Sequence, residues 1–379
     1  TNAVRIEEFI NYFDYDYATP EDSSPIAISS EIASCPWNKE NKLVRIGLRG
    51  KEIDKSQIPP GNFVFLIDVS GSMSDDIIMV KSAMKLLVSQ MRPQDSVAIV
   101  VYAGAAGLVL PATSGDKKDT IMKSLDSLRA GGSTAGGAGI KLAYKTALDN
   151  KTDKSNNRVI LITDGDFNVG PRSNADLEKL IEEKRKSGVF LSVLGVGRGN
   201  YKDAQMENLS NKGNGNYAYI DTYSEAKKVF LKEFGGSMLV IAKDVKIQVE
   251  FNPAKVKSYR LIGYENRALR NEDFEDDKKD AGEIGSNHKV TAFYEVVPRK
   301  EGEELSEKSE YTSTEITEEA KNSDDIMKLK LRYKDPDASE SKLKEVKVKD
   351  ADNLIDNATS DFQFASAVAE FAETSISSP

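Results

Sequence analysis

The sequence predicts an α/β protein in which a doubly wound, mostly parallel sheet is inserted into a second, smaller antiparallel β-sandwich domain. Between residues 60 and 236, short apolar runs alternate with helix-length amphipathic runs, which is typical of βαβ crossovers with helices on both faces of a sheet. After Gly236 the pattern becomes strand-like without intervening helices, which indicates antiparallel strands. Residues 1–59 hold too few strands to bury a core alone, so we expect them to pair with the C-terminal strands.

The central region is predicted from the spacing of its apolar residues. The run NFVFLI at 62–67 is nearly continuously apolar, as expected for a strand covered on both faces. From 77 to 91 apolar residues recur at steps of three and four, and Pro93 ends this helical pattern. In order, we expect strands at 62–67, 97–102, 107–110, 158–163, 189–194 and 216–220, and helices at 77–91, 117–128, 139–149, 173–187, 203–210 and 224–234.

The flanking regions are predicted to form the second domain. We expect a helix at 4–13, strands at 26–34, 42–49, 243–251, 255–264, 288–297, 326–333 and 341–349, and a last helix at 361–373. In that last helix we expect Phe364, Val368 and Phe371 to form the face that packs on the body. The predicted domains are therefore 1–59, 60–236 and 237–379.

Composition places the chain among ordinary globular proteins. It has 379 residues, of which 39% are hydrophobic and 30% charged, enough for two domains with buried cores. Its one cysteine, Cys35, excludes an internal disulfide and thiolate-based zinc sites. We expect Cys35 to be buried, the neighbouring Trp37 to anchor packing, and the only histidine, His288, to be a structural residue within a strand.

Charge argues against a nucleic-acid partner. The net charge is −9, and the segment 301–325 alone contains ten acidic and two basic residues. Without that segment, which we interpret as a solvated loop, the charge is −1, so the body has no excess of Lys and Arg with which to displace counterions from phosphates.

The most informative motif is Asp68-Val-Ser70-Gly-Ser72, placed where the strand 62–67 ends. Alternation lets one carboxylate and two hydroxyls point toward the same position, and all three are oxygen donors suited to a hard divalent cation. We expect two more oxygen donors at neighbouring strand ends, Thr134 in GGSTAGGAG and Asp164 in ITDGD. Ligand sites of such sheets lie at the carboxyl ends of the strands. The alternative is that DVSGS merely caps the following helix.

These three motifs resemble the metal-ion-dependent adhesion site of the von Willebrand factor type A (vWA) domain, a Rossmann-like fold, and the resemblance covers about residues 60–236. It implies that Asp68, Ser70, Ser72, Thr134 and Asp164 hold a divalent cation directly or through water. Mg²⁺ is the first expectation, with Mn²⁺ or Ca²⁺ as alternatives. The implied partner is a protein that presents an Asp or Glu carboxylate.

Other polar and glycine-rich segments are interpreted more conservatively. Asp75 and Asp76 have a spacing similar to the integrin β-subunit, where a second ion binds, but we favour stabilisation of the helix N-terminus. Asp166 is interpreted as a turn or rim residue. The segments GGAGI at 136–140 and GVGRGN at 195–200 do not match phosphate-binding patterns, so we interpret both as turns and close-approach loops.

The flanks, including VRIEEFINYFDYDY, CPWN and HKVTAFYE, are similar to exported bacterial proteins, often lipoproteins, with a vWA domain before a C-terminal domain of unknown function. This resemblance implies a cell-envelope location, periplasmic or extracellular, and membrane attachment only through a lipid anchor preceding Thr1. The expected function is non-enzymatic, metal-dependent protein binding. One alternative is an envelope scaffold acting through the β domain. The other is a Mg²⁺-dependent phosphotransferase of the haloacid-dehalogenase type, which would need an acid where Ser70 stands.

Overall fold

The computed structural model describes residues 5–132, 136–152, 155–165, 174–197, 203–230, 239–264, 270–277, 279, 281–300, 303, 316–336 and 338–377. The chain divides into two compact units, Thr1–Glu52 with Val240–Pro379, and Ile53–Leu239. We call the first the sandwich unit and the second the α/β unit, and each is described by itself.

The α/β unit is built on a six-stranded sheet of order β5-β4-β3-β6-β7-β8. Its strands are β3 (Gly61–Asp68), β4 (Ser96–Tyr102), β5 (Ala106–Ser114), β6 (Asn156–Thr163), β7 (Phe190–Val196) and β8 (Tyr217–Ile220). All neighbours pair in parallel except β4 and β5, which are antiparallel. The predicted doubly wound, mostly parallel sheet is therefore confirmed, with β3 at its centre.

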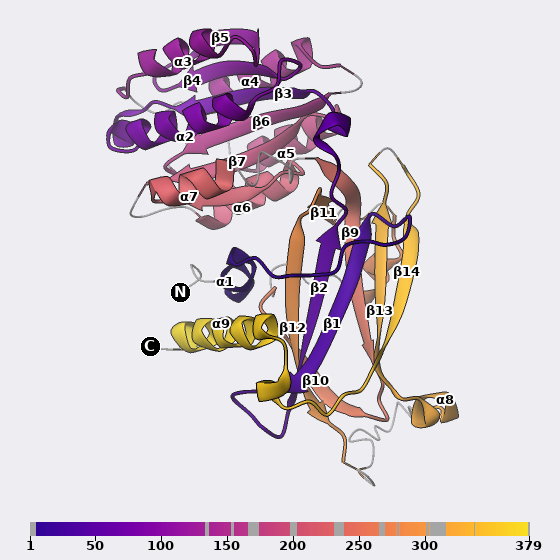
Figure 1. The fold of residues 1–379 in the computed structure, drawn as a ribbon. Helices are drawn as coiled ribbons and strands as arrows, with labels where there is room; N and C mark the ends of the chain where they lie inside the picture. Colours follow the sequence, from indigo (N-terminus) through magenta and orange to yellow (C-terminus); the bar gives the residue numbers. More distant parts are fainter. Residues whose placement is uncertain are drawn as a thin grey trace. The chain divides into compact units, whose positions relative to one another are not determined.

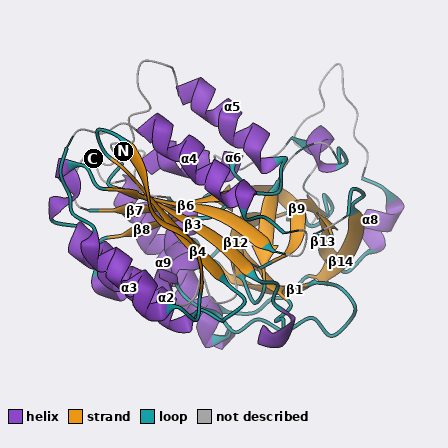
Figure 2. Ribbon diagram, turned by 90° about the horizontal axis from the view of Figure 1, so that it is seen from above, coloured by secondary structure: helices purple, strands orange, loops and turns teal. Residues whose placement is uncertain are grey.

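Helices cover both faces of this sheet, as Figure 2 shows for α2 and α3 on one side and α4, α5 and α6 on the other. They are α2 (Ile77–Gln90), α3 (Lys118–Ser127), α4 (Gly136–Asp149), α5 (Asn174–Arg185), α6 (Asp203–Lys212) and α7 (Tyr223–Lys228). The alternation along β3 explains this arrangement. Phe63, Phe65 and Ile67 join the core under α2, while Val64 and Leu66 join the core under α4. Two-sided burial accounts for the apolar run 63–67, which ends at Asp68; the buried Asn62 before it is hydrogen-bonded to Ala147 O and Asn157.

The sandwich unit contains two four-stranded antiparallel sheets, of order β1-β2-β12-β10 and β11-β9-β13-β14. The first combines the N-terminal strands β1 (Ile26–Ser34) and β2 (Lys42–Gly50) with β10 (Val256–Ile262) and β12 (Lys289–Pro298). The second consists of β9 (Val240–Phe251), β11 (Gly282–Gly285), β13 (Asp325–Lys334) and β14 (Lys342–Lys349). The N-terminal and C-terminal segments pair directly, because β2 and β12 run antiparallel with Val44 opposite Tyr294. One core between the sheets joins residues of both, including Ile46 and Leu329.

Two helices, α1 (Ile6–Tyr12) and α9 (Ser360–Ser377), cover the other face of the first sheet (Figure 1). The prediction for the buried face of α9 is wrong in detail. The residues that pack on the sheet are Phe362, Ala365, Ala369 and Ala372, all 0% exposed. Phe364 and Phe371 instead remain largely exposed, and Val368 is only half-buried. Both faces of α9 are apolar, so periodicity alone did not identify the face whose small residues allow close approach to the sheet.

Several local predictions also need correction. The short strand β11 and the helix α8 (Glu318–Asn322), which lies within the acidic segment, were not expected. The segment GGAGI at 136–140 forms the helical start of α4, not a loop as predicted. The predicted close approach does occur at Gly139, where a Cβ would lie 2.8 Å from Tyr102 Cβ. His288 lies in the turn before β12, where its amide donates to Gly285 O at 3.1 Å.

Among the helices that the structure describes, none is long and apolar enough to span a membrane.

Candidate metal centre

Asp68 ends β3 as a fully buried carboxylate whose oxygens are both engaged. Its Oδ1 accepts a hydrogen bond from the Ser70 amide at 2.8 Å. Its Oδ2 accepts from the Tyr102 hydroxyl at 2.9 Å and from Thr163 Oγ1 at 3.3 Å. Tyr102 and Thr163 end β4 and β6, the strands on either side of β3. The carboxylate is therefore oriented by groups from three adjacent strands.

This burial changes the acidity of Asp68. Desolvation raises the pKa of its carboxyl above the usual range, and the hydrogen bonds from Ser70 and Tyr102 only partly oppose that effect. The charge of Asp164 raises the same pKa further. A positive charge beside a desolvated carboxylate favours its ionised form. The position therefore suits a bound cation electrostatically.

The loop after Asp68 brings two serine hydroxyls together, one buried and one at the surface. Ser70 Oγ lies 3.0 Å from Ser72 Oγ, so the two hydroxyls form one adjacent pair of oxygen donors. Ser70 is buried and Ser72 is exposed. The short 3₁₀ segment η2 (Gly71–Ser74) follows, and it leads through Asp75 and Asp76 into α2.

A second loop is fastened to the first by backbone hydrogen bonds. The Gly71 amide donates to Gly132 O at 3.1 Å, and the Gly131 amide donates to Val69 O at 2.7 Å. Gly132 has φ of +94°, a conformation that side chains disfavour. This loop leads directly to 133–135, so Thr134 lies outside the described residues and its predicted role remains a prediction.

Asp164 follows the last residue of β6 and is half-buried. The next residue, Gly165, has φ of +94°, and its amide donates to Thr163 Oγ1 at 3.2 Å. Thr163 thus braces both this turn and Asp68. The structure brings Asp68, Ser70 and Ser72 together, with Asp164 close enough to affect Asp68. Asp166 lies outside the described residues.

The two acids after the motif differ in position. Asp75 is exposed, whereas Asp76 occupies the N-cap position of α2. The Asp76 carboxylate lies against Gly197 after β7, where a Cβ would be 2.7 Å from Asp76 Oδ2. Gly197 has φ of +104°, so glycine satisfies both the conformation and the space there.

Sequence reasoning missed Tyr102 and Thr163. A signal for both exists, because each is a hydroxyl-bearing residue at the end of a strand adjacent to β3, and Asp68 lies opposite Tyr102 in the parallel register. Predicting their role required the strand order, which the chain order of the strands does not reveal.

The donor chemistry fits a hard divalent cation. Among the described residues, no three His, Cys, Asp or Glu side chains come together as a metal-binding group. A cation at the end of β3 would therefore be held by the carboxylate of Asp68 and the neutral hydroxyls of Ser70 and Ser72, with Asp164 nearby. Oxygen donors of this kind are preferred by Mg²⁺, Mn²⁺ and Ca²⁺.

The other sequence candidates are packing residues. Cys35 is fully buried, and this burial raises the pKa of its thiol to about 11, so it is not a reactive thiolate. Trp37 packs on the core under α1 and α9, and its indole N–H donates to Glu295 at 3.2 Å.

Comparison with known proteins agrees with this fold. Residues 62–232 match the family model described as von Willebrand factor type A domain. Residues 236–379 match the model described as uncharacterized protein YfbK, C-terminal, and residues 1–45 match one described as von Willebrand factor. The fold and these matches define a vWA domain protein.

The relatives sharpen this assignment. The chain is 41% identical to uncharacterized protein YfbK of Escherichia coli K12, in an alignment that covers 98% of this chain and 66% of that protein. It is 27% identical to uncharacterized protein sll0103 of Synechocystis over 194 residues, 51% of this chain and 45% of that one. The chain thus spans less than two thirds of the length of each relative. It is a vWA domain protein with a YfbK-type C-terminal domain.

A solved structure supports the fold. The structure of von Willebrand factor type A from Catenulispora acidiphila aligns with a TM-score of 0.50 and 16% sequence identity, covering 88% of this chain and 75% of that chain.

Proposed function

We propose that the α/β unit is a metal-dependent protein-binding module that captures an Asp or Glu side chain of a partner protein. The proposed metal site comprises Asp68, Ser70, Ser72, Thr134 and Asp164, with Mg²⁺ as the first expected ion. The family match supports the coarser part, a protein-interaction module of the vWA class.

One observation supports this proposal most strongly: a buried, oriented carboxylate adjoins a pair of hydroxyls that leads outward to an exposed residue. Asp68 is 0% exposed and Ser70 only 2%, whereas Ser72 lies at the surface. The inner donors are thus held rigidly while the outer side is accessible to a partner. A divalent cation bound here would supply the positive charge that attracts an incoming carboxylate.

The residues around the site have definable roles. Tyr102 and Thr163 hold Asp68 in one orientation, so little side-chain freedom remains to be lost on binding. Ser70 and Ser72 add oxygen atoms without adding negative charge. Further carboxylates in their place would neutralise the cation and weaken its attraction for an acidic partner.

The geometry does not favour the phosphotransferase alternative. An enzyme of that type needs an acid two residues beyond the nucleophile to protonate the leaving group, but that position is occupied by Ser70, a poor proton donor whose hydroxyl lies 3.0 Å from that of Ser72. We expect generic phosphatase substrates with Mg²⁺ to be turned over only at background rates, and turnover that disappears in Asp68→Asn would reverse this preference.

We also propose the domain boundaries 1–59, 60–236 and 237–379. They are supported by the family matches at 62–232 and 236–379 and by the division into two compact units near residues 53 and 240. The cell-envelope location stays a prediction from the resemblance of the flanks.

The site can be tested with three serine variants of one loop. Isothermal titration with Mn²⁺ should detect binding to the wild-type chain. It should also detect binding to the control variant Ser74→Ala, because the Ser74 hydroxyl donates to Gly71 O at 2.6 Å and is not a proposed ligand. Ser70→Ala and Ser72→Ala should bind Mn²⁺ about tenfold or more weakly, because each loses a ligand. Equal binding by all four proteins would disprove the site.

The partner can then be sought by affinity capture in Mg²⁺ and in EDTA. A partner that is retained in Mg²⁺, released by EDTA and lost with Ser70→Ala would support the proposed function. Capture that is unchanged in EDTA would contradict it.

A further inference from the structure

The helix α9 has two apolar faces, and in the part of the chain that the structure describes only one of them is fully covered. Phe362, Ala365, Ala369 and Ala372 pack on the first sheet of the sandwich unit. On the opposite side, Phe364 is 48% exposed and Phe371 is 63% exposed. These two residues are seven apart and therefore lie on one face, two turns from each other. A helix that is apolar on both faces is normally buried on both.

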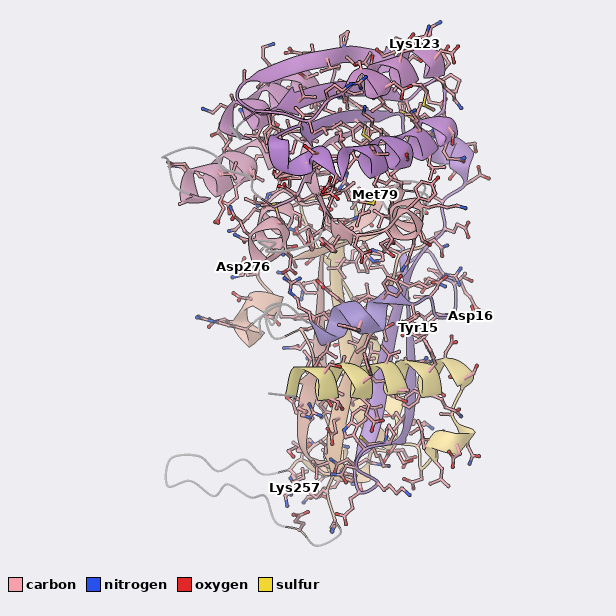
Figure 3. The ribbon with its side chains drawn as sticks, turned by 90° about the vertical axis from the view of Figure 1, so that its left-hand side faces the viewer. Tyr15, Asp16, Met79, Lys123, Lys257 and Asp276 are labelled. Carbon is pink, nitrogen blue, oxygen red and sulfur yellow. The ribbon has the colours of Figure 1, made fainter. Side chains whose placement is uncertain are left out.

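The exposed face of α9 continues onto α1, which lies beside it in Figure 3. The Phe13 and Phe364 rings meet edge to face with centroids 4.8 Å apart. Phe13 also contacts Tyr12 at 5.2 Å, and Phe9 contacts Phe371 at 6.4 Å. We call these five residues the aromatic strip. Contiguous exposed apolar surface of this kind marks an interaction site more often than scattered single residues do.

The surroundings of the aromatic strip are strongly acidic. Segments 5–17 and 360–377 together contain seven carboxylates and a single basic residue, Arg5, and they include neither lysine nor histidine. The carboxylates are Glu7, Glu8, Asp14, Asp16, Asp361, Glu370 and Glu373. Neighbouring elements supply Lys289, which pairs with Asp14 at 3.0 Å, and Arg260, which pairs with Glu373 at 2.5 Å. Within the segments, Glu7 is buried and Glu8 pairs with Arg5 at 2.5 Å. Asp14, Asp16 and Glu370 are exposed, so the rim keeps an excess of negative charge.

The negative charge around the aromatic strip favours one kind of binding partner over the others. A second copy of the chain would bring an identical acidic rim against this one, and like charges across an interface are repulsive. An anionic bilayer would be repelled in the same way. A cationic segment, in contrast, gains from the carboxylates, and its Lys or Arg side chains can also contact the faces of the exposed rings.

We propose that the aromatic strip docks a helical segment of a partner protein that carries apolar anchors on one face and Lys or Arg residues beside them. Its apolar side chains cover Phe364 and Phe371, and its cationic side chains meet the acidic rim. A bound helix contacts an apolar surface through anchors spaced three, four and seven residues apart, so one such helix can reach both Phe364 and Phe371, which lie two turns apart on α9. This interaction does not involve the proposed metal site, so it is independent of divalent cations.

The test uses a defined probe and matched variants of the full chain. The probe is a fluorescein-labelled peptide of about 18 residues, five helical turns, with Leu and Phe on one face and Lys and Arg on the other. Binding is followed by fluorescence anisotropy in EDTA. The double variant Phe364→Ser/Phe371→Ser is compared with Leu354→Ser, which alters a 61%-exposed apolar residue of the same unit outside the strip. Circular dichroism verifies that both variants are folded.

We expect the double variant to bind the cationic peptide about tenfold or more weakly, because exposed aromatics of this type act as anchors, while Leu354→Ser binds like the wild type. A peptide with every Lys and Arg replaced by Glu should not bind, and Glu370→Lys should weaken binding of the cationic peptide. The proposal is overturned if the cationic peptide fails to bind at micromolar concentrations, if the double variant binds it normally, or if the reversed peptide binds equally well. It is also overturned if the strip instead mediates dimerisation in sedimentation or attachment to anionic vesicles.

Discussion

At the carboxyl ends of its parallel strands, the α/β unit gathers oxygen atoms, whereas the sandwich unit exposes aromatic carbon along α1 and α9. Both oxygens of Asp68 accept hydrogen bonds from within the chain. Phe364 and Phe371 of the aromatic strip instead expose apolar surface to water. The first surface would recognise anionic side chains once a cation is bound. The second would recognise cationic, apolar segments without one. If both proposed interactions form, the two units prefer partners of opposite charge.

The largest expected effect tests whether the units are also energetically separate. Gly215→Ala would place a Cβ 1.8 Å from Leu191 O and 2.4 Å from Leu191 C, both backbone atoms of the α/β unit. Because backbone cannot rotate away, we expect the α/β unit to lose about 4 kcal/mol or more. Calorimetry should show one transition moving and the transition of the sandwich unit unchanged. A single shifted transition for the whole chain would show that the units unfold together.

A second comparison separates the two faces of α9. Phe362 is fully buried, meets Phe293 edge to face at 5.8 Å and lies under the Arg45 guanidinium at 5.6 Å. We expect Phe362→Ala to cost about 3–5 kcal/mol, as for other buried phenylalanines. Phe364→Ala should cost under about 1 kcal/mol, since half of that side chain is already in water. Chemical denaturation measures both, and equal costs would mean that Phe364 is a core residue.

The third prediction concerns the ion pair between Arg92 and the buried Asp95, which lies at the first residue of β3. Asp95 accepts from the Gly61 amide at 2.9 Å and pairs with Arg92 at 2.7 Å. Burial would raise the pKa of the Asp95 carboxyl, but the hydrogen bonds from Arg92 and Gly61 outweigh it and lower the pKa overall. Asp95→Asn should therefore destabilise the α/β unit by roughly 2–3 kcal/mol at pH 7, because Arg92 keeps its hydrogen bonds to Ile58 O and Pro59 O but loses the carboxylate that balances its charge.

The pH dependence of Asp95 follows from the sign of this shift. A carboxyl with a lowered folded pKa stabilises the protein above its unfolded pKa of about 3.9, and this contribution is lost as the pH falls through the folded value. The difference between wild type and Asp95→Asn should accordingly shrink below about pH 4. Asp126→Asn is the control, because Asp126 is exposed and pairs with Lys85 at the surface; we expect no measurable change there. A difference that is constant down to pH 2 would contradict the assignment.

The smallest effect on stability is expected at the metal site itself. Ser72 is exposed and its hydroxyl contacts Ser70, so Ser72→Ala should change the free energy of unfolding by less than about 0.5 kcal/mol in EDTA. Its effect should appear only with the ion, since a ligand raises stability by binding the folded state. Saturating Mg²⁺ should thus raise the melting temperature of the wild-type α/β transition and that of Ser74→Ala, but that of Ser72→Ala much less.

Much of the fold could be predicted because its signals are local. The apolar runs of the parallel sheet, the spacing of α2 and the strands 26–34 and 42–49 all follow from periodicities within one segment. The misses needed information that is not local. The four-residue β11, Gly282–Gly285, contains two glycines and forms only through pairing with β9. The orientation of α9 depends on how closely Ala365 and Ala369 approach the sheet.

The candidate site divides in the same way. Asp68, Ser70 and Ser72 are close together in sequence, so one motif and one strand end were enough to predict their proximity. Tyr102 and Thr163 are 34 and 95 residues from Asp68 in the sequence, and they contact it because their strands lie on either side of β3. Their contribution follows from strand order, which is a property of the sheet as a whole.

The pairing of β2 with β12 has a consequence for how the chain is made on the ribosome. Residue 50 ends β2 and residue 289 begins β12, so at synthesis rates of about 5–20 residues per second the N-terminal strands wait on the order of 10–50 s for their neighbour. The α/β unit is completed during that interval and can fold first. During that interval the edge of β2 that later pairs with β12 has no strand beside it, and unpaired strand edges of this kind favour association with other chains.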